Sequence, residues 1–174
     1  VEGVNVLIAK TVDTLVTSMN YDEFLTMKYM LARRLLDGLM KTVSIPEVTT
    51  DNMKPIISKV KGTSNNLTFM STNYNLMGVY NHTTKERQYI LINAEFDATM
   101  DVEVLASAFN MDRAEFFGHR ILIDSFATMD KARLSELFKD DENYKEITDE
   151  ELLALDKIPC MIVDEDFFQI YDNL

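Results

Sequence analysis

Short apolar runs separated by helical patterns organise this chain, most clearly in residues 88–126. Residues 89–92 form a nearly continuous run of aromatic and aliphatic side chains, and residues 120–124 repeat that character thirty-one residues later. A third apolar run covers residues 158–163. Runs this continuous are typical of strands without a solvated face. We therefore predict one mixed sheet with strands at residues 88–93, 120–124 and 158–163.

Apolar positions at helical spacing lie between and around these strands. Val102, Leu105 and Phe109 recur at i, i+3 and i+7, and Asp101 precedes them as a cap, which predicts a helix at residues 101–109 flanking the sheet. The same spacing predicts helices at residues 4–19, 20–38, 49–62, 132–138 and 148–155.

Several of these helices carry end signals. Asn20 with Glu23 and Thr148 with Glu151 have capping-box spacing, and Gly38 stands where a left-handed C-cap is expected. Asn52 is the predicted N-cap of the helix at residues 49–62. The helix boundaries are therefore predicted from caps as well as from periodicity.

Other segments have weaker patterns. Residues 40–45 have strand character that Pro46 ends, since proline cannot donate to a ladder. Residues 67–70 are interpreted as a short strand, and residues 71–88 lack a sustained period, which is typical of a loop with at most one helical turn.

The segment at residues 128–156, here called the acid-rich segment, combines two short helical patterns with many carboxylates. Ten acidic residues and four basic residues lie from Asp130 to Asp156. We expect this segment to be a peripheral, solvated excursion, so that replacing it by a short flexible linker would lower the thermal midpoint only modestly.

Size and charge limit the class of protein. A chain of 174 residues with 47% hydrophobic residues can bury one sizeable core, as a single domain or two closely packed lobes. A net charge of -12 disfavours nucleic-acid binding, which needs clustered Lys and Arg. No apolar run approaches the roughly 20 residues that span a bilayer. The single cysteine, Cys160, excludes an intramolecular disulfide and fits folding in a reducing cytoplasm.

The runs LINAEFDATMDVEVLASAFNMDRAEFFGHRILIDSFA and MIVDEDFFQIYDNL carry a family resemblance. Their most specific features are Asp97, the DVEVLASAFNM block, Phe117-Gly118, Ile123-Asp124 and the closing Val163-Asp-Glu-Asp-Phe-Phe. With them the chain resembles the major capsid proteins of small short-tailed bacteriophages of the phi 29 kind, which have the Hong Kong 97 fold. Residues 21–38 and 41–45 match more faintly.

The resemblance implies an α+β fold: a Hong Kong 97-like capsid core with a mixed β-sheet flanked by helices, made of the axial domain and part of the peripheral domain. Residues 1–45 would be a helical segment of the peripheral, spine-helix region. Residues 46–174 would be the axial-type domain, with the acid-rich segment as an insertion, because family members make this connection with a short turn.

The implied function is that of a structural subunit of a bacteriophage or prophage head, not an enzyme. It would fold in the bacterial host cytoplasm and self-assemble into the pentamers and hexamers of an icosahedral shell. The implied partners are copies of itself and, during assembly, a scaffolding protein. The resemblance implies no cofactor, no metal, no membrane and no sequence-specific nucleic acid. A bacterial compartment shell protein of the same fold is an alternative.

The chain is expected to be a fragment, because Val1 is not an initiator Met and family members extend beyond both ends with an N-terminal arm, an extended β-loop and a C-terminal continuation. We expect it to be monomeric or weakly associated. Its association should rise with salt if general repulsion dominates, and fall with salt if a basic face docks on an acidic neighbour.

A second alternative is an acidic, metal-dependent enzyme that uses carboxylate clusters. The candidates are Asp164, Glu165 and Asp166, or Asp97 with Asp101 and Glu103. A cation site needs several such groups to converge on one ion, and no calcium-loop spacing is present. Capping and solvation are the preferred explanation of these carboxylates.

The remaining reactive residue types give no catalytic motif. His82 and His119 are expected at the surface or at a strand end, and Cys160 as a small buried hydrophobe. No GxSxG, GxGxxG or P-loop motif exists among five glycines. We therefore predict no catalytic, cofactor-binding or metal-binding residue.

Four basic residues form the one candidate contact site: Lys28, Arg33, Arg34 and Lys41. One interpretation is a solvated face with local ion pairs to Asp22 or Asp37. The other is a contact for an acidic surface on a neighbouring subunit, since charge complementarity fixes the register of repeated contacts.

Overall fold

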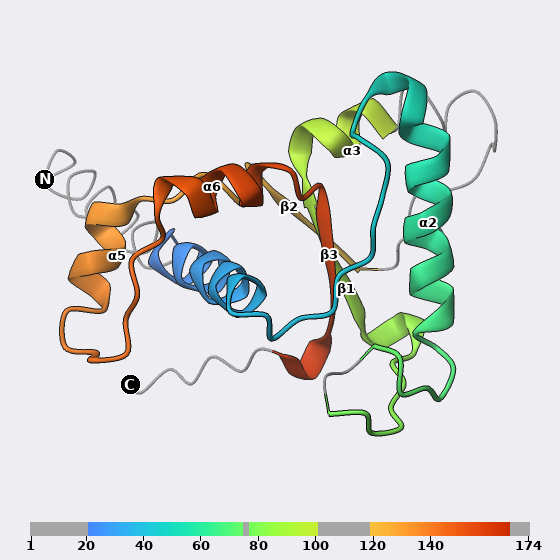
Figure 1. Ribbon diagram of the computed structural model, residues 1–174, viewed down its shortest axis with the longest axis horizontal. Helices are drawn as coiled ribbons and strands as arrows, with labels where there is room; N and C mark the ends of the chain where they lie inside the picture. Colours follow the sequence, from blue (N-terminus) through green and yellow to red (C-terminus); the bar gives the residue numbers. More distant parts are fainter. Residues whose placement is uncertain (1–20, 75–76, 101–118, 168–174) are drawn as a thin grey trace, which may run out of the picture.

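The computed structural model describes residues 21–74, 77–100 and 119–167 (Figure 1). Its centre is a three-stranded sheet of β1 (Gln88–Asn93), β2 (His119–Ile123) and β3 (Cys160–Asp164), in the order β2-β1-β3. Strand β1 is parallel to β2 and antiparallel to β3. The prediction of one mixed sheet from the three apolar runs is confirmed. The helix predicted at residues 101–109 lies outside the described residues.

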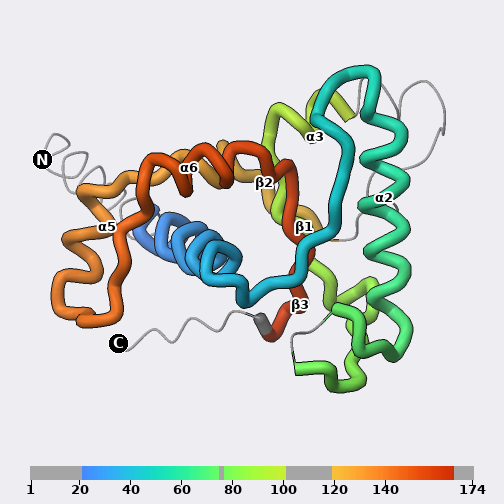
Figure 2. The backbone as a smooth tube through the Cα atoms, in the orientation of Figure 1, coloured from blue at the N-terminus to red at the C-terminus, as the bar shows by residue number. Residues whose placement is uncertain are grey.

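Both faces of the central strand β1 are covered, which explains its continuous apolar run, whereas the edge strand β2 leaves Leu122 51% exposed. Leu91 is paired with Ile121 on β2 and with Met161 on β3, and these side chains share one face. Ile90 and Ile92 point to the opposite face. Two separate hydrophobic clusters result, one on each face, and Figure 2 shows the helices in two groups on either side of the sheet.

The larger cluster joins one face of the sheet to the helical residues 21–36, to α5 (Lys131–Leu137) and to α6 (Asp149–Asp156). Its aromatic part is a group of rings, with Tyr29 5.2 Å from Phe138 and 5.3 Å from Tyr144 between ring centroids. The buried members are Leu25, Tyr29, Leu31, Ala32, Leu91, Ile123, Phe126, Leu134, Ile147, Leu155, Met161 and Val163.

The acid-rich segment is therefore part of the core, and the expectation that it is peripheral and solvated is wrong. Leu134, Ile147 and Leu155 are at most 2% exposed. The carboxylates of this segment occupy outward positions, while one apolar side chain in each short element turns inward, so the acidic composition hid the buried positions. Its helices were predicted well: α6 has the capping box between Thr148 and Glu151. That the segment is an insertion relative to family members stays a prediction.

The smaller cluster covers the other face with α2 (Met53–Asn66) and α3 (Ala94–Met100). A 3-10 turn, η1 (Thr50–Asn52), leads into α2. Asn52 occupies the predicted N-cap position, but its side-chain amide donates to the carbonyl of Glu47, 2.9 Å away, instead of capping the helix. The buried members are Met53, Ile56, Ile57, Val60, Ile90, Ile92, Phe96 and Met100.

Helix ends follow the cap residues. Gly38 has φ +74°, and the Gly38 and Leu39 amides donate to the carbonyls of Leu35 and Arg34, the pattern of a glycine-terminated helix. The predicted C-cap is thus confirmed. Helix α3 begins directly after β1 because the side-chain oxygen of Asn93 accepts from the amides of Glu95 and Phe96. The sequence patterns had not predicted this helix.

Two predicted strands are wrong. Residues 40–45 are irregular, and residues 67–69 form turns, with the Leu67 amide bonded to the Thr63 carbonyl. A segment with the composition of a strand forms one only where another strand pairs with it. The predicted loop that follows residue 70 is confirmed; it contains the bridge between Ser71 and Asn81 and ends in η2 (Lys85–Arg87). None of the described helices is long and apolar enough to cross a membrane.

Candidate interaction surface

The carboxylates at the end of β3 surround an arginine. An Arg87 nitrogen lies 3.0 Å from Asp164, another lies 3.4 Å from Glu165 of η4 (Glu165–Phe167), and Asp166 also bonds to this guanidinium. Burial opposes ionisation of Asp164, but hydrogen bonds from Thr83, the Asp166 amide and Arg87 outweigh it and lower its pKa. The Arg87 guanidinium lies between these carboxylates, where a metal ion would otherwise have to bind. Its ion pairs connect the end of β3 to the turn before β1.

The second carboxylate group is only partly described. Asp97 is buried and its oxygen lies 3.0 Å from Arg120, so this ion pair joins α3 to β2. Asp101 and Glu103 lie outside the described residues. In residues 21–74, 77–100 and 119–167, no three His, Cys, Asp or Glu side chains are placed to hold a metal ion.

The histidines have the positions expected of them, and the cysteine, expected to be buried, is partly buried. His82 is exposed, and His119 begins β2 with its ring 4.8 Å from that of Tyr89. Cys160 packs against the smaller cluster, and burial raises the pKa of its thiol to about 12. A thiol with this pKa is protonated at neutral pH and is a poor nucleophile.

Two of the four basic candidates are bound within the chain. The side chain of Lys28 is 3% exposed; its ammonium lies 2.9 Å from Asp124 and over the ring of Phe24. Arg33 lies 2.7 Å from Glu151 and 3.1 Å from the fourth residue after it, Asp37. These cations fasten the helical residues 21–36 to the sheet and to α6.

The other two candidates, Arg34 and Lys41, are exposed. The expected ion pair to Asp37 is confirmed, whereas Asp22 is paired with Arg133, 2.6 Å away, in the acid-rich segment. A role of the four basic residues between subunits stays a prediction, and Arg34 and Lys41 are its accessible members.

Residues 67–74 and 77–81, here called the exposed loop, carry exposed apolar side chains that the sequence patterns did not single out. Five large apolar side chains on it are between 56% and 87% exposed: Phe69, Met70, Met77, Val79 and Tyr80. Reciprocal hydrogen bonds of 3.0 Å between Ser71 and Asn81 close the loop. Contiguous exposed apolar side chains are typical of interaction sites. The sequence feature that could have revealed this surface is a set of large apolar residues in a segment that has neither helical nor strand periodicity.

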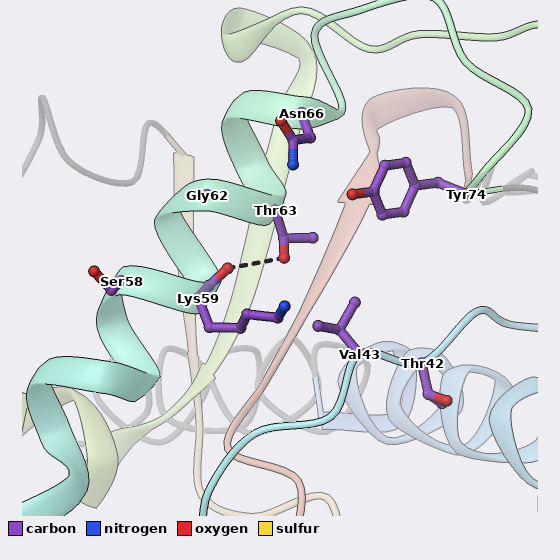
Figure 3. Close-up of a pocket in the computed structure, with 8 residues that line it drawn as sticks. All are labelled: Thr42, Val43, Ser58, Lys59, Gly62, Thr63, Asn66 and Tyr74. Carbon is purple, nitrogen blue, oxygen red and sulfur yellow. Dashed lines mark hydrogen bonds between the residues drawn. The ribbon is translucent and has the colours of Figure 1, made fainter.

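Beside this loop, the outward side of α2 contains an open cavity of about 290 Å³ (Figure 3). Figure 3 shows the Lys59 ammonium pointing toward Val43, and Tyr74 pointing toward α2. The remaining lining groups among the described residues are hydroxyls, an amide and a glycine, with no carboxylate: Thr42, Ser58, Gly62, Thr63 and Asn66. A cation among uncharged hydrogen-bonding groups suits a small anionic group such as a carboxylate.

Comparison with known families identifies the chain. The family model of the Phi29-like phage major capsid protein matches residues 1–174. The chain belongs to this family. The resemblance inferred from the sequence blocks is thereby confirmed, and so is the expectation of a structural, non-enzymatic protein, because that is the role of the family.

Three curated relatives are named major capsid protein. Those of Bacillus phage PZA and Bacillus phage GA-1 are 29% and 30% identical over 96% and 94% of this chain. The protein of Streptococcus phage Cp-1 is 30% identical over 67% of this chain. The matched regions make up 32%, 30% and 36% of these relatives, so the chain spans about a third of their length.

Proposed function

We propose that this chain is part of the structural subunit of a phage or prophage head, which packs side by side with its copies into the pentamers and hexamers of an icosahedral shell. The observation that carries the proposal is membership of the phage major capsid protein family over residues 1–174. The exposed loop supports it, because a subunit that functions by association needs accessible apolar surface.

The finer fold assignment belongs to the same proposal. A mixed sheet with helices on both faces is consistent with the axial domain of a Hong Kong 97-type capsid protein. Residues 1–45 would then come from the peripheral region and residues 46–174 from the axial domain. The partners would be copies of the chain, with a scaffolding protein during assembly, and the place of action the virion.

The metal-dependent enzyme receives no support from the comparisons. Arg87 forms ion pairs with the group around Asp164, and Arg120 is bound to Asp97. Each group has a structural explanation in the ion pair that it makes. The compartment shell alternative has the same fold and is an outcome of the assembly experiment.

The test is expression of the complete gene product in a bacterial host, with and without the neighbouring genes, followed by electron microscopy. Closed shells of uniform size that enclose DNA, or empty precursors of them, are expected. Closed shells that contain only cargo protein would favour the compartment. A soluble product that forms no regular assembly under either condition would refute the proposal.

A further inference from the structure

Charge is distributed unevenly along this chain. Between Asp51 and Glu86 the sequence contains four lysines and no acidic residue, although the whole chain has a net charge of -12. Within that stretch, residues 62–84 carry no Asp, Glu, Lys or Arg at all. This part folds into α2 and the exposed loop, so these two elements carry lysines and no carboxylate, while Asp51 and Glu86 flank them.

The lysines of this end are accessible. Lys54 and Lys59 on α2 are exposed, and neither makes an ion pair within the described residues; the ammonium of Lys59 lies in the cavity. The Lys85 ammonium donates to Ser64 over 2.5 Å, and burial together with the nearby charge of Lys61 lowers its pKa. The exposed positive charge is therefore carried along α2, and the apolar side chains of the exposed loop follow its C-terminal end.

The other end of the molecule has the opposite character. Helix α5 and the turn after it lie at the far end of the long axis from α2 (Figure 1). Five carboxylates of this turn and of α6 are exposed and make no ion pair within the described residues: Asp140, Asp141, Glu142, Glu146 and Glu150. Leu134, Ile147 and Leu155 are buried, so the backbone that carries these carboxylates is packed against the core.

We propose that the α2 end of one copy docks on the acid-rich end of a second copy, with carboxylates of residues 140–150 meeting Lys54 and the cavity around Lys59. The exposed loop supplies the apolar area of the contact. The inference rests on the proposed function, because it names the faces that meet in side-by-side packing. Since the two faces differ, the contact repeats from copy to copy and generates a ring when the rotation closes.

Charge complementarity selects this orientation and this partner. Copies with a net charge of -12 repel one another, so they approach best where one of them presents positive charge. Nucleic acid fits less well, because four lysines beside an uncharged apolar loop neutralise few phosphates. The polar lining of the cavity offers hydroxyl and amide donors to a carboxylate.

The first experiment is carbodiimide crosslinking of the complete gene product, which joins an amine to a carboxylate only when the two touch. Equal amounts of normal and heavy-nitrogen protein are mixed so that links between copies are recognised by mass. Links from Lys54 or Lys59 to residues 140–150 of another copy are expected. If links between copies form only at other positions, the assigned faces are wrong.

The second experiment reverses charge. Lys54→Glu with Lys59→Glu should weaken association at least about tenfold in sedimentation, whereas Lys157→Glu, an exposed lysine outside both faces, should change it far less. Asp140→Lys with Glu142→Lys should also weaken self-association. Mixing the two double variants should restore association, because the acidic α2 face of the first variant meets the lysines that the second variant carries at positions 140 and 142.

These outcomes separate the inference from the function. If the wild-type product forms shells and the Lys54/Lys59 variant forms them equally well, the assigned faces are wrong and the function stands. If the wild type forms none, the function fails first. If the Lys54/Lys59 variant loses binding to a short DNA duplex and not self-association, the surface is a polyanion site and the inference is refuted. Circular dichroism and melting of each variant exclude unfolding as the cause.

Discussion

Replacing Leu155 by alanine should destabilise the chain far more than replacing Leu153 by alanine. Both residues lie on α6 and undergo the same chemical change, but Leu155 is 0% exposed and Leu153 is 69% exposed. Leu155 packs in the larger cluster with residues from the sheet and from the helical residues 21–36. The comparison therefore measures burial alone, with helix propensity and charge held constant.

The expected size follows from the packing. Leu→Ala removes three carbon groups, each about 0.8 kcal/mol when buried, which gives about 2.4 kcal/mol before any cavity is counted. The cavity that remains raises the loss to about 2.7–5 kcal/mol. The exposed Leu153→Ala change should stay within about 0.5 kcal/mol. For a chain of this size, 1 kcal/mol shifts the midpoint by roughly 2–4 °C, so the two melting temperatures should differ by about 5 °C or more.

Thermal and urea unfolding followed by circular dichroism measures both variants against the wild type. A lower urea midpoint with an unchanged slope would show that stability fell and the unfolding reaction stayed the same. Equal, small effects of the two substitutions would show that the acid-rich segment does not share the core. That result would contradict the burial of Leu155 and restore the solvated interpretation of the segment.

Three further changes test the ion pairs and the cysteine. Asp124→Asn should destabilise by about 1–3 kcal/mol in urea unfolding, more than Lys28→Met, because it leaves a buried ammonium without its carboxylate. Hydrogen bonding by Arg33 lowers the pKa of Glu151 in the folded chain. The stabilisation from this carboxylate is therefore present above about pH 4.3 and is lost as the pH falls through the lower pKa of the folded state. In a plot of melting temperature against pH, Glu151→Gln should reduce the fall in melting temperature at acid pH. Cys160 should react with a thiol reagent at pH 8 only after unfolding, and rapid reaction of the native chain would contradict its burial.

The sheet was predictable from the sequence because its three strands are apolar runs and its central strand, β1, is buried on both faces. Continuous apolar runs leave little ambiguity of period, and each of the three runs became a strand within two residues of its expected bounds. The capping box of α6 and Gly38 were predictable for a different reason: each satisfies backbone groups locally, without a distant partner.

What the sequence did not reveal depends on contacts between distant segments. Residues 40–45 have the composition of a strand, but pairing decides whether a strand forms, and no local pattern reports it. The burial of the acid-rich segment was not predicted because the charges were counted over the whole segment, without regard to which positions face inward. Its buried residues are spaced irregularly, since Ile147 lies on a connection between two short helices.

The candidate contact surface shows how folding sorts charges. Lys28 and Arg33 looked available in the sequence, but the fold places Asp124 and Glu151 against them, residues about a hundred positions away. Arg133 of the acid-rich segment likewise meets Asp22. Some charged side chains of the helical residues 21–36 and of the acid-rich segment thus form ion pairs that hold these elements together.

Among the described residues, the lysines of α2 and the carboxylates of residues 140–150 include charges that make no ion pair, and these two elements lie at opposite ends of the molecule. Helix α2 has no acidic residue and lies across the sheet from the acid-rich segment, so its lysines cannot be neutralised by the carboxylates of that segment in the same copy. In the proposed docking, the lysines of α2 attract the acid-rich end of another copy in one orientation, while acidic surfaces repel each other in others. High salt should weaken such an attraction, since screening acts over about 10 Å at 0.1 M. Association that rises with salt would show that general repulsion between acidic chains is the larger effect.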